Sequence, residues 1–416
     1  MSDQGTRGLR IAMALYGAIT YDSRVQREAE ALAQAGHTVT IYCISGTPPE
    51  GARYRTVVGV PSGSSVLPDG SSPFLGASRS SRWARMTGRF KWIVGFARNI
   101  RAWGRWAVAA AGEVDVWHVH DLTGLMAIGP VRAKGSLLVY DSHEIFLEAG
   151  TAARLPGFLR RLLGLVERRL SRRAVALVTV NDPIAEILAR RLRPRRTVVI
   201  RNCPPRWDPP VPRPDLIRAA TAIPADAPIA LYHGDFSAHR GLEELAAVIL
   251  LPGFENLHAV YLGRGPEWAM LERMALDPVY AGRLHLLAAV GPDELLPWVS
   301  SADIGVILIQ ASTRNHRLAT PNKLFEALAA GLPVIASDFP GMHQIVLDDP
   351  LSPLGAVCRP DDLDAVARAM ATIVELSPVD RDAMRQRCLQ AAHERWNWET
   401  ESARLVDLYA GIRAAS

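Results

Sequence analysis

The sequence predicts an α/β protein made of two Rossmann-like domains, and three observations point to this class. The chain has 416 residues, which is enough for two domains of ordinary size. Short apolar strands alternate with amphipathic helices along most of it, a pattern typical of parallel sheets. Six prolines gather in residues 204–214 and indicate a stiff linker between two βα-rich halves.

The first half opens with a βαβ unit. Residues 9–16 are predicted as a strand, residues 22–36 as a helix and residues 37–44 as the next strand. The loop after the first strand starts at Gly17 and lacks the G-x-G-x-x-G pattern, which disfavours a NAD-dependent dehydrogenase. Later strands are predicted over residues 114–121, 136–144, 175–180 and 197–200, and helices over residues 154–173 and 182–193.

Two of these strands end in polar clusters. His120 and Asp121 close one strand, and the run Asp141-Ser142-His143-Glu144 closes the next. Open α/β sheets bind ligands at the carboxyl ends of their strands, so the two clusters predict a binding site. Imidazole groups can donate hydrogen bonds to sugar hydroxyls and stabilise developing charge, which favours His143 and His120 as functional residues. The alternative is that these histidines are structural.

A basic, tryptophan-rich segment lies between the second and third predicted strands. Residues 79–112 contain eight Arg or Lys, four Trp and no acidic residue. The apolar stripe shifts beyond Gly95, which predicts two helical pieces with a bend there. One interpretation is that Arg79–Arg105 contacts an anionic membrane or forms an acceptor surface. The alternative is a helix that packs on the core and exposes a basic face to solvent.

The charge is unevenly spread along the chain. Residues 1–205 hold 29 Arg and Lys against 15 Asp and Glu, and the remainder holds 18 against 27. A basic half suits an anionic membrane or a phosphorylated acceptor, and we predict no nucleic-acid partner. The four cysteines are far apart and show no metal-binding or redox spacing, so we predict reduced thiols and no metal. A polar start and the lack of a long apolar run predict a cytoplasmic protein, with peripheral contact to the inner membrane face as the further expectation.

The second half repeats the alternation of strands and helices. Arg240 lies in a glycine-flanked loop, residues 235–241, where it is a candidate phosphate clamp. A turn follows at Gly263-Arg264-Gly265-Pro266. Strands are predicted over residues 229–234, 258–263, 283–287 and 302–308, and helices over residues 242–249, 292–300, 361–374, 380–396 and 400–414.

Residues 320–336 are the most informative stretch of this half. Thr320 is predicted as an N-cap, Pro321 as the first helical residue, Gly331 as the helix end and residues 334–336 as a buried strand. Free N–H groups at a helix start attract anions. Three residues separate Lys323 from Glu326, so the two share a face that suits a phosphate and a neighbouring diol. The alternative is a surface βα unit with a solvated lysine.

The run from Pro321 to Ile335 resembles the donor-site motif of the retaining GT-B glycosyltransferases of family 4. The resemblance implies two domains that face a deep cleft: an acceptor domain over 1–205, a donor domain over 206–395, and a helix over 396–416 that crosses back to the first domain. It also implies transfer of a hexose, such as glucose or N-acetylglucosamine, from a UDP-linked donor with retention of configuration. No metal or cofactor is implied, since the nucleotide-sugar is a co-substrate.

The resemblance also assigns residues. Arg240 and Lys323 would stabilise the departing diphosphate, Glu326 would hold the ribose and His143 would orient the sugar. The backbone near Val290 would hold the base. The other implied binding residues are Gly17, His120, Asp121, Glu144, Asn202, Gly234, Gly241, Gly263, Arg264, Pro321, Asn322 and Leu324.

Two positions depart from the family pattern. Asp235 stands where the family often has a basic residue, and Leu318 stands where it has the first of two glutamates. Two alternatives therefore stay open: a nucleotide-sugar epimerase or hydrolase of the same fold, and a non-catalytic sugar-binding protein with a decayed donor site. The acceptor is left open among lipid-linked, phosphorylated and small-metabolite compounds.

Overall fold

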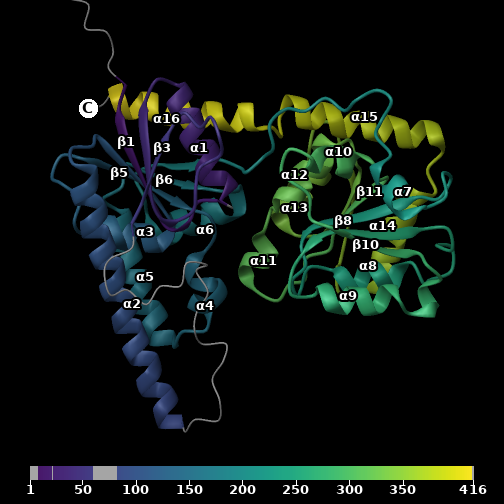
Figure 1. Cartoon of the computed structure of the whole chain (residues 1–416), viewed down its shortest axis with the longest axis horizontal. Coiled ribbons are helices and arrows are strands. Elements are labelled where there is room, and N and C mark those ends of the chain that lie inside the picture. Colours follow the sequence, from purple (N-terminus) through teal and green to yellow (C-terminus); the bar gives the residue numbers. More distant parts are fainter. Residues whose placement is uncertain (1–7, 21, 60–81, 415–416) are drawn as a thin grey trace, which may run out of the picture. The chain divides into compact units, whose positions relative to one another are not determined.

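The computed structural model describes residues 8–20, 22–59 and 82–414, with the backbone alone for residues 82–94 and 151 (Figure 1). The chain divides into two compact units. Unit 1 is the chain up to Ile200 together with the segment from Ser402 onward, and unit 2 is Arg201–Glu401. None of the helices in the described part of the chain is long and apolar enough to cross a membrane.

The unit boundaries differ by a few residues from the expected domain limits at 205 and 395. The segment after Ile200 belongs to unit 2 because Cys203 lies in its hydrophobic core. The Arg201 backbone N–H donates to Glu401 Oε2 over 2.9 Å, and the Trp398 N–H donates to the Pro204 carbonyl over 2.8 Å. These bonds hold the start and the end of unit 2 together.

Unit 1 is built on a parallel sheet. Over the described residues the strand order is β3-β2-β1-β4-β5-β6-β7. The order reverses between β1 and β4, and open α/β sheets bind ligands beside such a reversal. The strands are β1 (Arg10–Ala18), β2 (Thr38–Ser45), β3 (Arg55–Val58), β4 (Val116–His120), β5 (Leu137–Ser142), β6 (Ala176–Thr179) and β7 (Thr197–Val199). The helices are α1 (Ser23–Gln34), α2 (Arg82–Ala111), α3 (Asp121–Ile128), the 3-10 turn η2 (Phe146–Glu148), α4 (Gly150–Ala153), α5 (Gly157–Ser171) and α6 (Asp182–Leu192), and α16 (Trp398–Ala414) joins them from Ser402 onward.

Unit 2 repeats this plan with the strand order β10-β9-β8-β11-β12-β13 over its described residues, again all parallel. Its reversal lies between β8 and β11. The strands are β8 (Ile229–Asp235), β9 (His258–Arg264), β10 (Leu284–Ala288), β11 (Ile304–Ile307), β12 (Val334–Ser337) and β13 (Gly355–Cys358). The helical elements are α7 (Leu216–Thr221), α8 (Leu242–Val248), α9 (Trp268–Ala275), η3 (Pro278–Tyr280), α10 (Leu295–Ser300), α11 (Arg314–Leu318), α12 (Asn322–Ala329), α13 (Pro340–Val346), α14 (Leu363–Val374) and α15 (Pro378–Glu394). The predicted α/β class with two Rossmann-like halves is confirmed.

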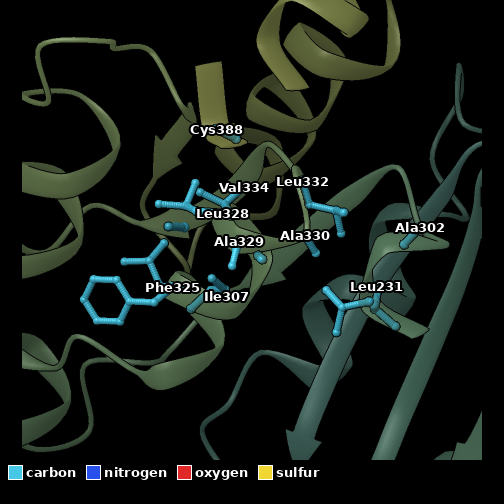
Figure 2. Close-up of a cluster of buried hydrophobic side chains, with 14 of the residues drawn as sticks. Leu231, Ala302, Ile307, Phe325, Leu328, Ala329, Ala330, Leu332, Val334 and Cys388 are labelled. Atoms are coloured by element: carbon cyan, nitrogen blue, oxygen red, sulfur yellow. The ribbon is translucent and has the colours of Figure 1, made fainter. Parts of the chain in front are cut away.

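Helix α12 is fixed to unit 2 by its apolar face. Leu324, Phe325 and Leu328 are almost completely buried in the core. Figure 2 shows Phe325 and Leu328 in one cluster with Ile307 of β11 and Val334 of β12. Full burial of such a side chain stabilises a fold by about 1.5–3 kcal/mol. The opposite face of α12, which carries Lys323 and Glu326, is therefore held on a rigid support.

The prediction for the basic segment was wrong in one respect, because α2 is a single helix of 30 residues without the break expected near Gly95. One interior glycine costs a helix only about 1 kcal/mol relative to alanine, which a long helix tolerates. Within the described side chains, Trp103 is fully buried while Arg98, Arg101 and Arg105 are exposed. This part of α2 fits the core-packed alternative. Residues 79–81 of the expected membrane segment lie outside the described residues.

Candidate functional site

Three histidines surround one carboxylate at the carboxyl ends of β4 and β5 in unit 1. His118 and His120 are two residues apart, so they lie on the same face of β4, and their rings stack with centroids 4.8 Å apart. Asp141 of β5 is the register partner of His120. Its Oδ2 lies 3.9 Å from His118 Nε2, 3.5 Å from His120 Nδ1 and 3.5 Å from His143 Nε2.

Arg24 of α1 holds this carboxylate from the other side. Its Nε and Nη2 donate to the two oxygens of Asp141, each over 2.9 Å. The same guanidinium lies 3.1 Å from Glu28 Oε1 and donates to the Ile200 carbonyl over 2.6 Å. Arg24, Glu28 and Asp141 are all buried. Burial raises the pKa of Glu28 well above its ordinary value despite the opposing charge of Arg24. The Asp141 carboxyl behaves in the opposite way: burial opposes its ionisation, but Arg24 and His143 outweigh that effect and hold its pKa well below the usual range.

His143 is held between two carboxylates. Its backbone N–H donates to Asp121 Oδ1 over 3.1 Å, and its Nδ1 lies 3.6 Å from Asp121 Oδ2. Burial lowers the pKa of His143, but the charges of Asp121 and Asp141 outweigh it and raise the pKa to about 10. Asp121 itself has φ +56°, a left-handed conformation that aspartate tolerates better than most residues. This turn directs the Asp121 carboxylate at His143.

The pKa values of the two inner histidines, His118 and His120, are lowered, unlike that of His143. Burial lowers the pKa of His118, and it lowers that of His120 to about 4. The 3.2 Å contact between His120 Nδ1 and His143 Nε2 therefore joins a neutral ring to a protonated one, with His143 as the donor. The hydroxyl oxygen of Tyr409, in α16, lies 2.9 Å from His118 Nδ1. The arrangement presents one partly exposed imidazolium backed by buried neutral rings.

The ligand atoms of Glu28, His118, His120 and Asp141 lie within 4.8 Å of one another, close enough to raise the question of a metal ion. Both Asp141 oxygens already accept hydrogen bonds from Arg24, whose charge also faces Glu28. A divalent cation at this point would be repelled by the guanidinium and would lose the carboxylate that Arg24 occupies. The residues fit an internal ion-pair network better than a metal centre.

Three other residues were predicted from the first half of the sequence: Gly17, Glu144 and Asn202. Gly17 is part of β1 rather than of the predicted loop, because the strand extends to Ala18. Glu144 follows β5, and its carbonyl accepts a hydrogen bond from Ser142 Oγ over 2.8 Å. Asn202, expected to close the first domain, belongs to unit 2.

In unit 2 the predicted donor residues gather at the carboxyl ends of β8 and β9 and at the start of α12. Gly234 and Gly263 are register partners, and a Cβ on Gly263 would lie 1.9 Å from the Gly234 carbonyl oxygen. Gly241 has φ +80°, and a Cβ there would lie 2.3 Å from Leu308 Cβ. Glycine at these points leaves the loop that carries Arg240 close to the sheet.

Lys323 reaches back from α12 over β8. Its Nζ lies 3.5 Å from the ring centroid of Tyr232, a cation–π contact, and 3.6 Å from the Cβ position of Gly234. Burial and the nearby charge of Arg240 lower the pKa of Lys323 to about 7, although Glu326 and Asp235 oppose the shift. Arg240 and Lys323 repel each other, and an anion bound between them would relieve that repulsion.

Glu326 is oriented by His233 of β8, whose Nε2 lies 3.0 Å from Glu326 Oε2. Pro321, rather than Thr320, is the N-cap of α12, so the predicted side-chain cap was wrong. Proline adopts the extended conformation that an N-cap needs, but it has no side-chain acceptor. The Leu324 N–H donates to the Pro321 carbonyl over 3.0 Å, and the Leu324 side chain is buried.

The two departures from the family pattern have neighbours that bear on them. Asp235 is the register partner of Arg264, so a cation stands beside the unexpected acid. Leu318 is the last residue of α11. In the same helix, the ring centroid of His316 lies 6.4 Å from that of His239, the residue that precedes Arg240 in the chain. Val290 follows β10 and is partly buried against the core of unit 2.

Sequence reasoning did not single out Arg24, Glu28, His233 and Tyr232 as site residues, and it placed Asp141 in a predicted polar cluster without giving it a role. A signal for the first pair was present: Arg24 and Glu28 are opposite charges four residues apart on the side of α1 that also carries buried Val25, Ala29 and Leu32. A charged pair on an apolar face is unusual and indicates a buried partner.

Known families match both halves of the chain. The description "glycosyl transferase 4-like domain" fits residues 21–203, and "glycosyl transferases group 1" fits residues 227–375. The chain belongs to the family-4 glycosyltransferases of GT-B fold. It is thus an enzyme of the hexosyltransferase class, as predicted.

Individual relatives are more distant. A D-inositol 3-phosphate glycosyltransferase of Xylanimonas cellulosilytica is 27% identical over 98% of this chain and 97% of its own length. A GDP-mannose-dependent alpha-(1-6)-phosphatidylinositol monomannoside mannosyltransferase of Mycolicibacterium smegmatis is 31% identical, but the match spans 37% of this chain and 40% of that relative. Among solved structures, a sucrose-phosphate synthase from Thermosynechococcus elongatus has a TM-score of 0.72 and 20% identity, and covers 98% of this chain and 100% of its own.

Proposed function

We propose that this glycosyltransferase transfers a hexose from a nucleoside-diphosphate sugar with retention of configuration. The observation that carries the proposal is the group formed by Arg240, Lys323 and Glu326 at the strand reversal of unit 2. Two cations there suit a diphosphate, and a carboxylate one helical turn from Lys323 suits the ribose diol. His233 holds that carboxylate in place.

The proposed step is a front-side displacement. The bond between the anomeric carbon and the diphosphate oxygen breaks while the acceptor hydroxyl oxygen bonds to the same face of the sugar, and the acceptor proton passes to the departing diphosphate oxygen. Negative charge grows on the departing diphosphate, where Arg240 and Lys323 stabilise it more strongly than in the ground state. In this proposal His143 orients the sugar hydroxyls, the buried His120 supports the His143 ring, and Glu144 is a further candidate contact.

The proposal also concerns which nucleotide base the donor carries and which class of acceptor receives the sugar. The family resemblance implies a UDP-linked donor, whereas the mannosyltransferase relative uses GDP-mannose according to its name. The names of two relatives contain inositol phosphate or phosphatidylinositol acceptors, and a phosphorylated or lipid-linked acceptor is consistent with a basic first half.

A thermal-shift panel with UDP, GDP, UDP-glucose, UDP-N-acetylglucosamine and GDP-mannose tests the donor site, since a ligand that binds only the folded state raises its stability. We expect one nucleotide series to raise the melting temperature. Lys323→Ala should weaken that nucleotide about 10- to 100-fold, which corresponds to losing one or two charge-assisted hydrogen bonds. Lys134→Ala, an exposed lysine of unit 1, is the matched control and should leave affinity unchanged.

The same panel can also contradict the proposed donor site. If no nucleotide stabilises the chain, or if Lys323→Ala binds as well as the unchanged protein, the donor site is not where we place it. Once a donor is found, proton NMR of the anomeric coupling in the first-formed product reports the stereochemistry. An inverted product would exclude the front-side mechanism.

A further inference from the structure

Helix α5 of unit 1 exposes an apolar stripe to solvent. Phe158 is 74% exposed, Leu162 54% and Leu165 63%. The three residues are spaced by four and three positions, so they lie on one side of the helix. Large apolar side chains grouped in this way are unusual on a soluble surface and mark an interaction site.

The same helix is strongly basic. Helix α5 contains four arginines and a single acid, Glu167. Glu167 is buried and is already used, because its carboxylate oxygens bond to Arg191 and to the Tyr140 hydroxyl. Arg161 and Arg169 are exposed on the side of the helix that carries the apolar stripe. The solvent-facing side of α5 therefore combines apolar and positive groups and holds no negative charge.

A hollow of about 860 Å³ lies beside this stripe. Phe158 and Leu165 line it together with Arg160, Arg161 and Arg168, and one acid, Glu148, also lines it, so the arginines outnumber the acid. Arg160, Arg161 and Arg168 bring three guanidinium groups to the lining of this hollow. Phosphate oxygens are strong acceptors for guanidinium N–H groups.

We propose that α5 docks the protein on the surface of a bilayer that contains anionic phospholipids. The apolar stripe formed by Phe158, Leu162 and Leu165 enters the boundary between headgroups and acyl chains, and the arginine-lined hollow receives lipid phosphates. The feature meets the physical requirements for an interfacial helix: an apolar face, flanking arginines and no exposed acid. This surface is separate from the α2 segment that the sequence singled out, and it goes beyond the proposed transfer reaction.

Vesicle flotation tests this docking. The full-length protein is mixed with vesicles of phosphatidylcholine alone or of phosphatidylcholine with phosphatidylglycerol, at low and at physiological ionic strength. We expect binding to the phosphatidylglycerol vesicles only, weakened by salt because screening reduces the arginine contribution. Leu162→Ser combined with Leu165→Ser should lower the partition coefficient at least about tenfold, since two side chains no longer leave water.

Matched variants distinguish docking through α5 from nonspecific apolar adsorption and from an effect of net charge. Leu276→Ser with Val279→Ser removes two equally exposed apolar residues from unit 2 and should bind vesicles as the unchanged protein does. Arg161→Gln with Arg169→Gln should lower binding about fivefold per arginine near an anionic surface. Arg273→Gln with Arg359→Gln changes the net charge equally on unit 2 and should have little effect.

Three outcomes would overturn the proposal. These are binding to neither vesicle, equal binding to both, or equal loss in the α5 variants and in their unit 2 controls. A concentration-dependent dimer in light scattering that the Leu162→Ser and Leu165→Ser changes abolish would assign the stripe to a second copy of the chain instead. Nucleotide thermal shifts of the α5 variants should match those of the unchanged protein, so a failure of the donor site is distinguishable from a failure of docking.

Discussion

Arg24 holds two buried carboxylates in unit 1, so its loss should be costly. Arg24→Ala removes the guanidinium that pairs with both Glu28 and Asp141 and leaves His143 as the remaining cation beside Asp141, and breaking a buried pair in this way costs about 3–5 kcal/mol. We expect a large decrease in the urea midpoint of unit 1. Arg190→Ala is the matched control, since Arg190 forms the same type of helical pair with Glu186 over 2.6 Å but is 78% exposed. Exposed pairs contribute about 0–1 kcal/mol, so equal effects of the two changes would contradict the buried network.

Lys323 makes the proposed donor binding depend on pH. Its pKa of about 7 in the free protein means that it is largely neutral at pH 8, whereas a bound diphosphate favours the charged form. Binding above pH 7 therefore takes up a proton, and affinity should fall by up to about tenfold per pH unit. Titration calorimetry between about pH 7.5 and 8.5 isolates Lys323, because a phosphate whose pKa is about 6 is already fully ionised there.

The lysine variants supply the control for this pH effect. Lys134→Ala should keep the decrease in affinity, and Lys323→Ala should abolish it while binding weakly throughout. A flat profile in the unchanged protein would contradict the proposed proton uptake by Lys323 on diphosphate binding.

At the scale of elements, the loop before α8 depends on Gly241. Gly241→Ala adds a Cβ 2.3 Å from Leu308 Cβ at φ +80°. Gly253→Ala is the matched control, since Gly253 has φ +90° but no atom within 4 Å of its Cβ position. The left-handed conformation alone costs about 1–2 kcal/mol, and the overlap with Leu308 should add about 1–3 kcal/mol and displace Arg240.

Urea denaturation and the nucleotide thermal shift measure the two consequences separately. We expect Gly253→Ala to lower stability without changing nucleotide affinity, and Gly241→Ala to lower both. If the two variants had equal effects on both measurements, the close approach of the loop to Leu308 would not be what positions Arg240.

The elements also show what could be predicted from sequence. Strong periodicity placed β1, β4, β5 and α12 within a few residues. Short elements such as β3 and α11 were missed, because four or five residues carry too little periodicity to distinguish a strand or helix from a loop. The pairs that organise the sites were beyond local reasoning for another cause: Arg24 and Asp141 are 117 residues apart, and His233 and Glu326 are 93 apart. Only the strand order brings them together.

At the scale of the whole molecule, the last helix joins residues that the chain order separates. Helix α16 begins in unit 2 and belongs to unit 1 from Ser402 onward, where Leu405, Leu408 and Tyr409 are buried. The Tyr409 hydroxyl and His118 Nδ1 lie 2.9 Å apart although 291 residues separate them in the sequence. The end of the chain therefore completes the histidine cluster near its beginning.

Removing this one hydroxyl tests that connection. Tyr409→Phe keeps the ring but leaves the buried His118 Nδ1 without its partner, which should cost about 1–3 kcal/mol of unit 1 stability. Tyr54→Phe is the control, because Tyr54 is 5% exposed and its hydroxyl has no hydrogen-bond partner within the described residues. Losing an unsatisfied buried hydroxyl should be neutral or stabilising. Urea midpoints compare the two variants, and a loss in Tyr54→Phe as large as that in Tyr409→Phe would mean that the cost comes from the ring environment and not from the bond to His118.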